Sequence, residues 1–321
     1  MSDFKFDSQG FSRRGLLKAT GYGSLAALLG SAMGPMSVAF AAGAPIKTVR
    51  PGYLTAACLG DMPLGALREG VPVGTDLELL KLIADRLELK LEVLTMGFPA
   101  VVEAVRSGRA DWFGGNCAWN PMRSKILLLT DPVFYTGAYV IMRDSEPFDT
   151  SITVNDVKGR TIGAITGYFT IPDMRKIEGV KEVKLYDNTD SCLRDVRAGR
   201  LDFAVLDAPT IDYMILQDPS LKLKQIPMTY DEKFPSLTAK FEAIWGIHPQ
   251  NQDLFDGVNQ GLRWLKATDQ IRPILAKYGI KNPDYLVPPA KDPRIGVDRD
   301  EKGNLIGPFA HPARDFSQAF A

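Results

Sequence analysis

The chain has 321 residues, of which 45% are hydrophobic and 24% are charged, a composition that can bury a core in one or two globular domains. Its 38 basic and 38 acidic residues balance, so the basic face that a nucleic-acid partner would require is not expected. With two histidines, three cysteines, no Cys-x-x-Cys pair and no Gly-rich phosphate loop, the sequence gives little support to a structural metal site or a nucleotide cofactor, and we expect neither.

The first 41 residues have the pattern of a targeting segment. Ser12-Arg13-Arg14-Gly15-Leu16-Leu17-Lys18 precedes an uncharged stretch from 19 to 46, and Ala39-Phe40-Ala41 supplies the small residues that a signal peptidase reads. This arrangement resembles a twin-arginine export signal, so we expect residues 1–41 to be cleaved near Ala41 and the mature protein to be periplasmic. The alternative is an N-terminal membrane anchor, but glycines and Pro35 interrupt the run before the roughly 20 apolar residues that span a bilayer.

The three cysteines are Cys58, Cys117 and Cys192, an odd number that allows at most one disulfide in an oxidising compartment. Export of a folded chain weakens the case for an essential disulfide. We therefore expect all three thiols to be free and largely buried.

Strands and helices alternate after the targeting segment. We expect a strand at 48–53, a helix opened by a capping box of Thr75 and Glu78, a strand at 89–94, a helix at 98–107 and a strand from Asp111. This alternation predicts a parallel sheet built from βαβ units.

One heptad occurs twice. Val105-Arg-Ser-Gly-Arg-Ala-Asp111 returns 91 residues later as Val196-Arg-Ala-Gly-Arg-Leu-Asp202, and each copy ends a helix at a glycine before a new strand begins. A polar residue lies five positions beyond each aspartate, Asn116 in the first copy and Asp207 in the second. Helix-Gly-strand patterns can produce such a pair by chance, but we favour two related lobes with Asn116 and Asp207 at equivalent strand ends.

The second unit follows the same alternation. Its expected strands are 161–165, 183–186 and 203–206, with helices after Gly167 and at 191–198. A strand at 241–247 and helices at 254–267 and 271–278 are expected to pack back on the first unit. The proline-containing tail is expected to form a hairpin on the body or to be partly loose. It is not a calcium loop, because the fifth and twelfth positions counted from Asp298 hold Lys302 and Phe309.

A series of short motifs, in order and spacing, resembles family 3 periplasmic solute-binding proteins of amino-acid ABC transporters over roughly residues 49–278. The motifs are Gly74-x-Asp76-x-Glu78-Leu79, Gly108-Arg-Ala-Asp111, Asn120-Pro-Met-Arg123, Leu129-Thr-Asp-Pro132, Val157-Lys-Gly159, Gly199-Arg-Leu-Asp202 and Asp207. The resemblance implies an α/β, type II periplasmic-binding-protein fold of two Rossmann-like lobes joined by two hinge crossings. The expected division is 42–141 with 242–290 for lobe one, 142–241 for lobe two and 291–321 for a C-terminal extension.

The resemblance also implies ligand-binding residues. Arg123 would hold a ligand carboxylate, helped by groups near Asn116 and Ala118, because a planar guanidinium binds a carboxylate through two hydrogen bonds. Asp207 would bind the ligand ammonium, although an aspartate at a strand end can instead cap a neighbouring helix.

The opposite wall and the mouth of the cleft depart from the family pattern. A helix N-terminus after Gly167 would face the carboxylate, but Tyr168 and Phe169 stand where a hydroxyl is usual. Asp61 lies in an altered loop at 58–64, and Trp119 could form a pocket wall. These departures leave the side-chain preference of the ligand site open.

The function that the resemblance implies is capture of a small carboxylate ligand, an amino acid above all, by a monomer that delivers it to an ABC permease in the inner membrane. Two alternatives use the same fold. One is an enzyme similar to periplasmic cyclohexadienyl dehydratases, with Asp61 or Asp207 as the general acid, and the other is an accessory protein of a periplasmic dehydrogenase.

Overall fold

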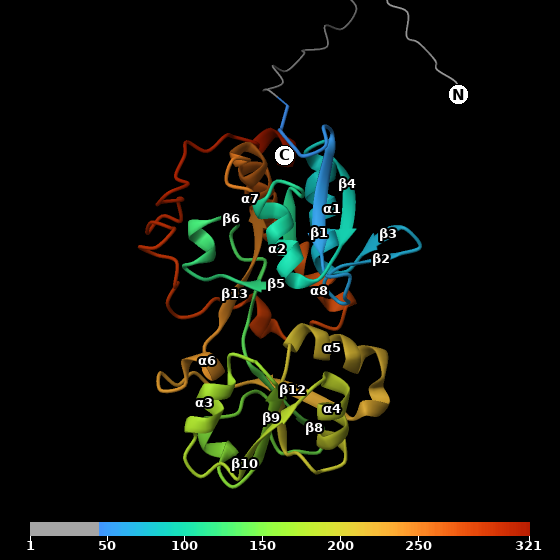
Figure 1. The fold of residues 1–321 in the computed structure, drawn as a ribbon, viewed down its shortest axis with the longest axis vertical. Helices are drawn as coiled ribbons and strands as arrows, with labels where there is room; N and C mark the ends of the chain where they lie inside the picture. The colour runs from blue at the N-terminus through green and yellow to red at the C-terminus, as the bar shows by residue number, and fades with distance from the viewer. Residues whose placement is uncertain (1–44) are drawn as a thin grey trace, which may run out of the picture. The chain divides into compact units, whose positions relative to one another are not determined.

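Two separate mixed β-sheets carry the fold in the computed structural model, which describes residues 45–321 (Figure 1). Residues 46–321 form one compact unit. The expected twin-arginine segment and its cleavage point at Ala41 lie outside the described residues. No helix in the described range is both long enough and apolar enough to cross a membrane.

Lobe one is organised around the first sheet. In spatial order its strands are β4 (Lys90–Thr95), β1 (Tyr53–Cys58), β5 (Trp112–Ala118), β13 (Phe241–Ile247) and β6 (Leu128–Leu129), with β7 (Phe134–Thr136) also paired to β13. The pairs of β1 with β4 and β5 are parallel, as expected. Strand β13 instead runs antiparallel to β5, because the chain enters this sheet on its return from lobe two.

Lobe two is organised around the second sheet. Its strands, in spatial order, are β10 (Glu182–Tyr186), β9 (Thr161–Ile165), β11 (Phe203–Val205), β8 (Tyr139–Arg143) and β12 (Leu223–Pro227). The first three are parallel, whereas β8 pairs antiparallel with both β11 and β12. The expected boundary after residue 141 therefore falls inside β8, which pairs only with strands of the second sheet.

Both sheets are covered by helices on both faces because successive side chains of a buried strand point to opposite sides. In lobe one, Leu54 and Ala56 contribute to the core under α1 (Thr75–Arg86), α7 (Gln252–Ala267) and α8 (Ile271–Lys277). Ala57 and Phe113 contribute to the core on the other face, against α2 (Phe98–Arg106). Lobe two repeats this arrangement with α3 (Ile171–Lys176) and α6 (Pro235–Thr238) on one face, and α4 (Thr189–Arg197) and α5 (Ala208–Gln217) on the other.

Two crossings connect the lobes, one between β7 and β8 and one between α6 and β13. They run side by side: a Cβ atom built on Gly137 would lie 3.1 Å from the carbonyl oxygen of Ala239. Glycine at this position therefore permits the close approach of two backbones.

Several local expectations were wrong. The first strand begins at Tyr53 rather than at residue 48. The capping box at Thr75 does not form, because Gly74 is the N-cap and the Glu78 carboxylate accepts hydrogen bonds from Tyr278 and Lys277 instead. The hairpin of β2 (Ala66–Arg68) and β3 (Val71–Val73) and the helix α5 were not predicted. The three cysteines are buried and unbonded to one another, which confirms that prediction.

The C-terminal extension, residues 291–321, packs against lobe one (Figure 1). His311 and Arg314 contact the carboxylate of Asp256 on α7, and the ring of Phe320 lies 5.7 Å from that of Trp264. No cluster of metal-ligating side chains occurs within residues 45–321. Asp298 is buried in ion pairs with arginines instead.

Candidate functional site

The two residues that follow the repeated heptads meet across the lobes. The side-chain amide of Asn116, on β5 of lobe one, donates a hydrogen bond of 2.8 Å to Oδ1 of Asp207, at the end of β11 in lobe two. The two positions are not equivalent in detail, because Asn116 lies within β5 whereas Asp207 follows the end of β11 and begins α5.

Asn116 is held in an uncommon backbone conformation. Its φ of 53° lies in the left-handed region, which asparagine tolerates better than most residues. The side-chain oxygen, Oδ1, is buried and has no hydrogen-bond partner among the described residues. A buried amide oxygen facing the junction of two lobes is a ready acceptor for a ligand donor.

Asp207 fulfils the alternative role that its position allowed. Its side chain caps α5: Oδ2 accepts the hydroxyl of Thr210 at 2.5 Å and the backbone amide of the same residue at 3.3 Å. Capping fixes the carboxylate while Oδ1 remains directed at Asn116. The structure thus shows both a capping aspartate and an anionic group at the junction of the lobes.

The loop after β5 positions Arg123. The side-chain oxygen of Asn120 accepts the backbone amides of Met122 and Arg123 at 3.0 and 2.9 Å, which turns the chain into the short helix η1 (Arg123–Lys125). The guanidinium of Arg123 then donates to the carbonyl oxygen of Ala118. Asn120 therefore organises the turn that presents Arg123.

Trp119, inside this loop, is anchored by the C-terminal extension. Its indole N–H donates to Oδ2 of Asp298 at 3.1 Å, and the guanidinium carbon of Arg294 lies 5.9 Å from the ring centroid. No local sequence pattern predicts this contact, because 179 residues separate Trp119 from Asp298.

The expected helix N-terminus after Gly167 is displaced. Helix α3 begins at Ile171 and has only six residues, and the amide of Tyr168 donates to the carbonyl of Ile165 within its own turn. The Tyr168 ring packs with the apolar cores of lobe two, and burial, together with the charge of Asp207, raises the pKa of its hydroxyl. Phe169 is 62% exposed, with its ring 6.5 Å from that of Phe241.

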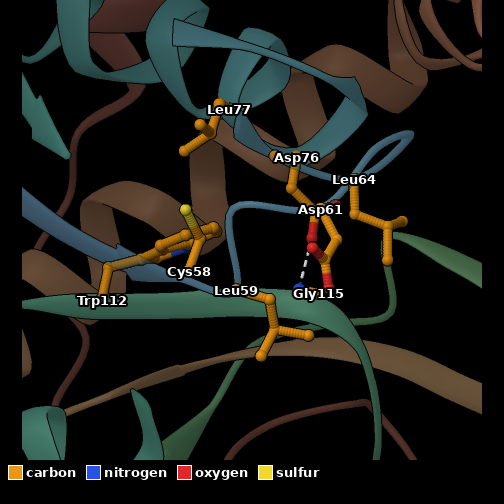
Figure 2. A pocket seen from close by; sticks show the side chains of 9 residues that line it. Cys58, Leu59, Asp61, Leu64, Asp76, Leu77, Trp112 and Gly115 are labelled. Atoms are coloured by element: carbon orange, nitrogen blue, oxygen red, sulfur yellow. Dashed lines mark hydrogen bonds between the residues drawn. The ribbon is translucent and has the colours of Figure 1, made fainter. Parts of the chain in front are cut away.

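Asp61 is exposed and lines a small cavity that also contains Asp76 (Figure 2). Figure 2 shows the Asp76 carboxylate bonded to the backbone amide of Gly115, at 2.6 Å. Burial raises the pKa of Asp76 to about 6, and the Gly115 amide opposes that shift. Asp76 thus holds the backbone of β5 at the residue before Asn116, a role its motif alone did not reveal.

Comparisons with known proteins give a consistent result. The sequence pattern of the family described as "Bacterial extracellular solute-binding proteins, family 3" matches residues 54–281. The "Probable amino-acid-binding protein YxeM" of Bacillus subtilis is 24% identical over 222 residues, which are 67% of this chain and 79% of that protein. The "Histidine-binding periplasmic protein" of Escherichia coli is 20% identical over 218 residues, 65% and 80% of the two chains.

Solved structures share the fold. The L-cystine solute receptor of Neisseria gonorrhoeae, in its unliganded open conformation, superposes with a TM-score of 0.62 at 16% identity, covering 74% of this chain and 96% of that one. An ancestral arginine-binding protein bound to glutamine gives a TM-score of 0.52 at 23% identity, covering 72% and 99%. These similarities confirm the expected two-lobed type II fold.

Proposed function

Because the chain belongs to family 3 of the bacterial extracellular solute-binding proteins, we propose that it binds an amino acid, or a closely related small carboxylate, between its lobes. Proteins of this family are binders rather than enzymes. The relatives named for arginine, histidine and general amino-acid binding support the ligand class. We further propose that an ABC permease receives the ligand, and that a twin-arginine signal in residues 1–41 exports the chain to the periplasm.

The observation that carries the ligand proposal is the meeting of Asn116 with Asp207 beside the Arg123 loop. Arg123 would bind the α-carboxylate through its guanidinium, and Asp207 would bind the α-ammonium in place of the Asn116 amide. Asn116 would then turn its buried oxygen towards the ligand. Contacts from both lobes favour a closed state because only that state makes them together.

Isothermal titration calorimetry against the twenty common L-amino acids tests this proposal. We expect at least one of them to bind wild-type protein. We expect Arg123→Ala to weaken that binding by about 2 to 5 kcal/mol, because the ligand carboxylate would be buried without its partner. The matched control is Arg109→Ala, since the Arg109 side chain is exposed and donates to Ser107.

Two outcomes would contradict the proposal. Folded wild-type protein that binds none of the twenty amino acids would remove the ligand class. An Arg123→Ala variant that binds as tightly as wild type would remove Arg123 from the site.

A further inference from the structure

The C-terminal extension lies beyond the residues that match the family, yet its buried charged side chains bind it to lobe one. Arg294 and Arg299 are 2% and 4% exposed. The Arg294 guanidinium donates to the carbonyl oxygens of Thr130 and Leu129 at 2.6 and 2.9 Å, and Arg299 donates to that of Leu129 at 2.7 Å. These carbonyls belong to β6 and the residue after it, at the edge of the first sheet.

Asp298 connects this network to the candidate ligand loop. Its carboxylate accepts two hydrogen bonds from Arg294, at 3.0 and 2.9 Å, and a third from the indole of Trp119, at 3.1 Å. Buried ion pairs contribute little to stability once desolvation is counted. A network of this kind is better explained by what it holds in place.

What it holds is the orientation of Trp119. The backbone amide of Trp119 donates to the carbonyl of Glu242 on β13 at 2.9 Å, so the residue is fixed at its main chain by lobe one and at its ring by the extension. Trp119 stands between Ala118, whose carbonyl accepts the Arg123 guanidinium, and Asn120, whose oxygen accepts the Arg123 amide. A change in the position of the Trp119 ring would therefore displace the loop that presents Arg123.

We propose that the C-terminal extension is part of the ligand site, and that Asp298 is a positioning residue which fixes the Trp119 indole as a rigid wall of the cleft. This inference rests on the proposed function. A wall that is ordered before the ligand arrives avoids the entropy cost of ordering a large side chain on binding, which corresponds to up to about tenfold in affinity.

The first test follows Trp119 directly and requires no ligand. The full chain is labelled with 5-fluorotryptophan, which gives signals for its four tryptophans, and the Trp119 signal is assigned with Trp119→Phe. In Asp298→Asn we expect the Trp119 signal to shift or broaden while the other three stay in place. Asp315→Asn, an exposed aspartate of the same extension, is the matched control and should move none of them. An unchanged Trp119 signal in Asp298→Asn overturns the proposal.

The second test measures affinity by calorimetry with L-arginine, L-histidine and L-glutamine. We expect Asp298→Asn to bind up to about tenfold more weakly and Asp315→Asn to bind as wild type does. Because Trp119→Phe removes the indole donor while Asp298 keeps its hydrogen bonds from Arg294, it covers the case in which Asp298→Asn unfolds. In the double variant we expect no loss beyond that of Trp119→Phe alone, since both changes break one contact.

The outcomes separate the two claims. If wild-type protein binds these amino acids and Asp298→Asn binds them equally well, the positioning role is overturned and the proposed function stands. The same holds if the affinity losses of Asp298→Asn and Trp119→Phe add fully in the double variant. Wild-type protein that binds none of them counts against the proposed function, and the fluorine signal of Trp119 then decides the positioning role by itself.

Discussion

Two aspartates show how single residues maintain the internal repeat. The carboxylate of Asp111 accepts the backbone amides of Val49 and Thr55, and that of Asp202 accepts the amide and hydroxyl of Thr161. Each ties the start of one strand to the neighbouring strand in its sheet. The repeated heptad therefore performs the same structural task in both lobes.

Glu242 makes stability depend on pH. It is 3% exposed, and burial raises its pKa from 4.5 to about 7. Arg294 opposes that shift, as Lys266 does weakly, whereas Asp292 and Asp298 reinforce it. Between pH 4.5 and 7 the folded chain holds the proton that the unfolded chain has lost, so the free energy of unfolding should fall as pH rises, by on the order of 1 to 3 kcal/mol, and level off above pH 7.

Chemical denaturation of wild type and Glu242→Gln at several pH values measures this effect. Asp76 and Asp212 also have pKa values raised to about 6 and give a slope of the same sign, so the difference between the two proteins is the informative quantity. Glu178→Gln, at an exposed position, should keep the wild-type slope. Identical slopes for wild type and Glu242→Gln would show that Glu242 does not hold its proton.

At the scale of elements, the sequence predicted what local pattern determines. Apolar runs and the repeated heptad predicted the positions of β9, β13, α1, α2 and α7 within a few residues. The direction of strand pairing was not predictable. Strand β8 is antiparallel to β11 and β13 is antiparallel to β5, and both strands directly follow a crossing between the lobes. The same holds for the candidate site: Asn116 and Asp207 followed from the repeat, whereas the anchor of Trp119 lies in a tail that local pattern could not place.

Strand β13 packs against β5 with no space at Gly246. A Cβ atom there would lie 1.9 Å from Cε1 of Phe113, in the centre of the first sheet. We expect Gly246→Ala to lower the free energy of unfolding by about 1 to 3 kcal/mol, because the aromatic ring must move within a close-packed core. Denaturant unfolding checks this value.

Gly97→Ala serves as the comparison for Gly246→Ala. A Cβ atom on Gly97 would meet nothing within 4 Å, and the residue has an ordinary negative φ. Its replacement should change the free energy of unfolding by less than about 1 kcal/mol. Equal effects at the two positions would argue that β13 has room to adjust.

At the scale of the whole described unit, hydrogen bonds join the lobes apart from the crossings, and one of them runs from the hydroxyl of Tyr139 on β8 to the carboxylate of Asp284 at 2.8 Å. Asn116 donates to Asp207, Arg68 of β2 donates to the hydroxyl of Tyr213 at 3.0 Å, and the hydroxyl of Tyr285 donates to Asp212 at 2.7 Å. Two of these acceptors are carboxylates of lobe two, so their partners in lobe one determine how readily the lobes approach.

Asn116→Asp should open the cleft. The substitution preserves shape and tolerates the left-handed backbone, but it places a second carboxylate against Asp207, and like charges in contact repel. Small-angle X-ray scattering at pH 8 and low salt should give a larger radius of gyration than wild type. Asn155→Asp, at an exposed position of lobe two, should not. A variant as compact as wild type would mean that Asn116 does not control closure.

The late return of β13 to the first sheet also sets an order of assembly during synthesis. All five strands of the second sheet lie between residues 139 and 227, so lobe two is a contiguous stretch of chain. Lobe one remains without the strand that joins β5 to β6 and β7 until residue 247 has been made. Lobe one, whose first strands are synthesised first, is therefore completed last. A nascent chain carries an open sheet edge until its final quarter emerges.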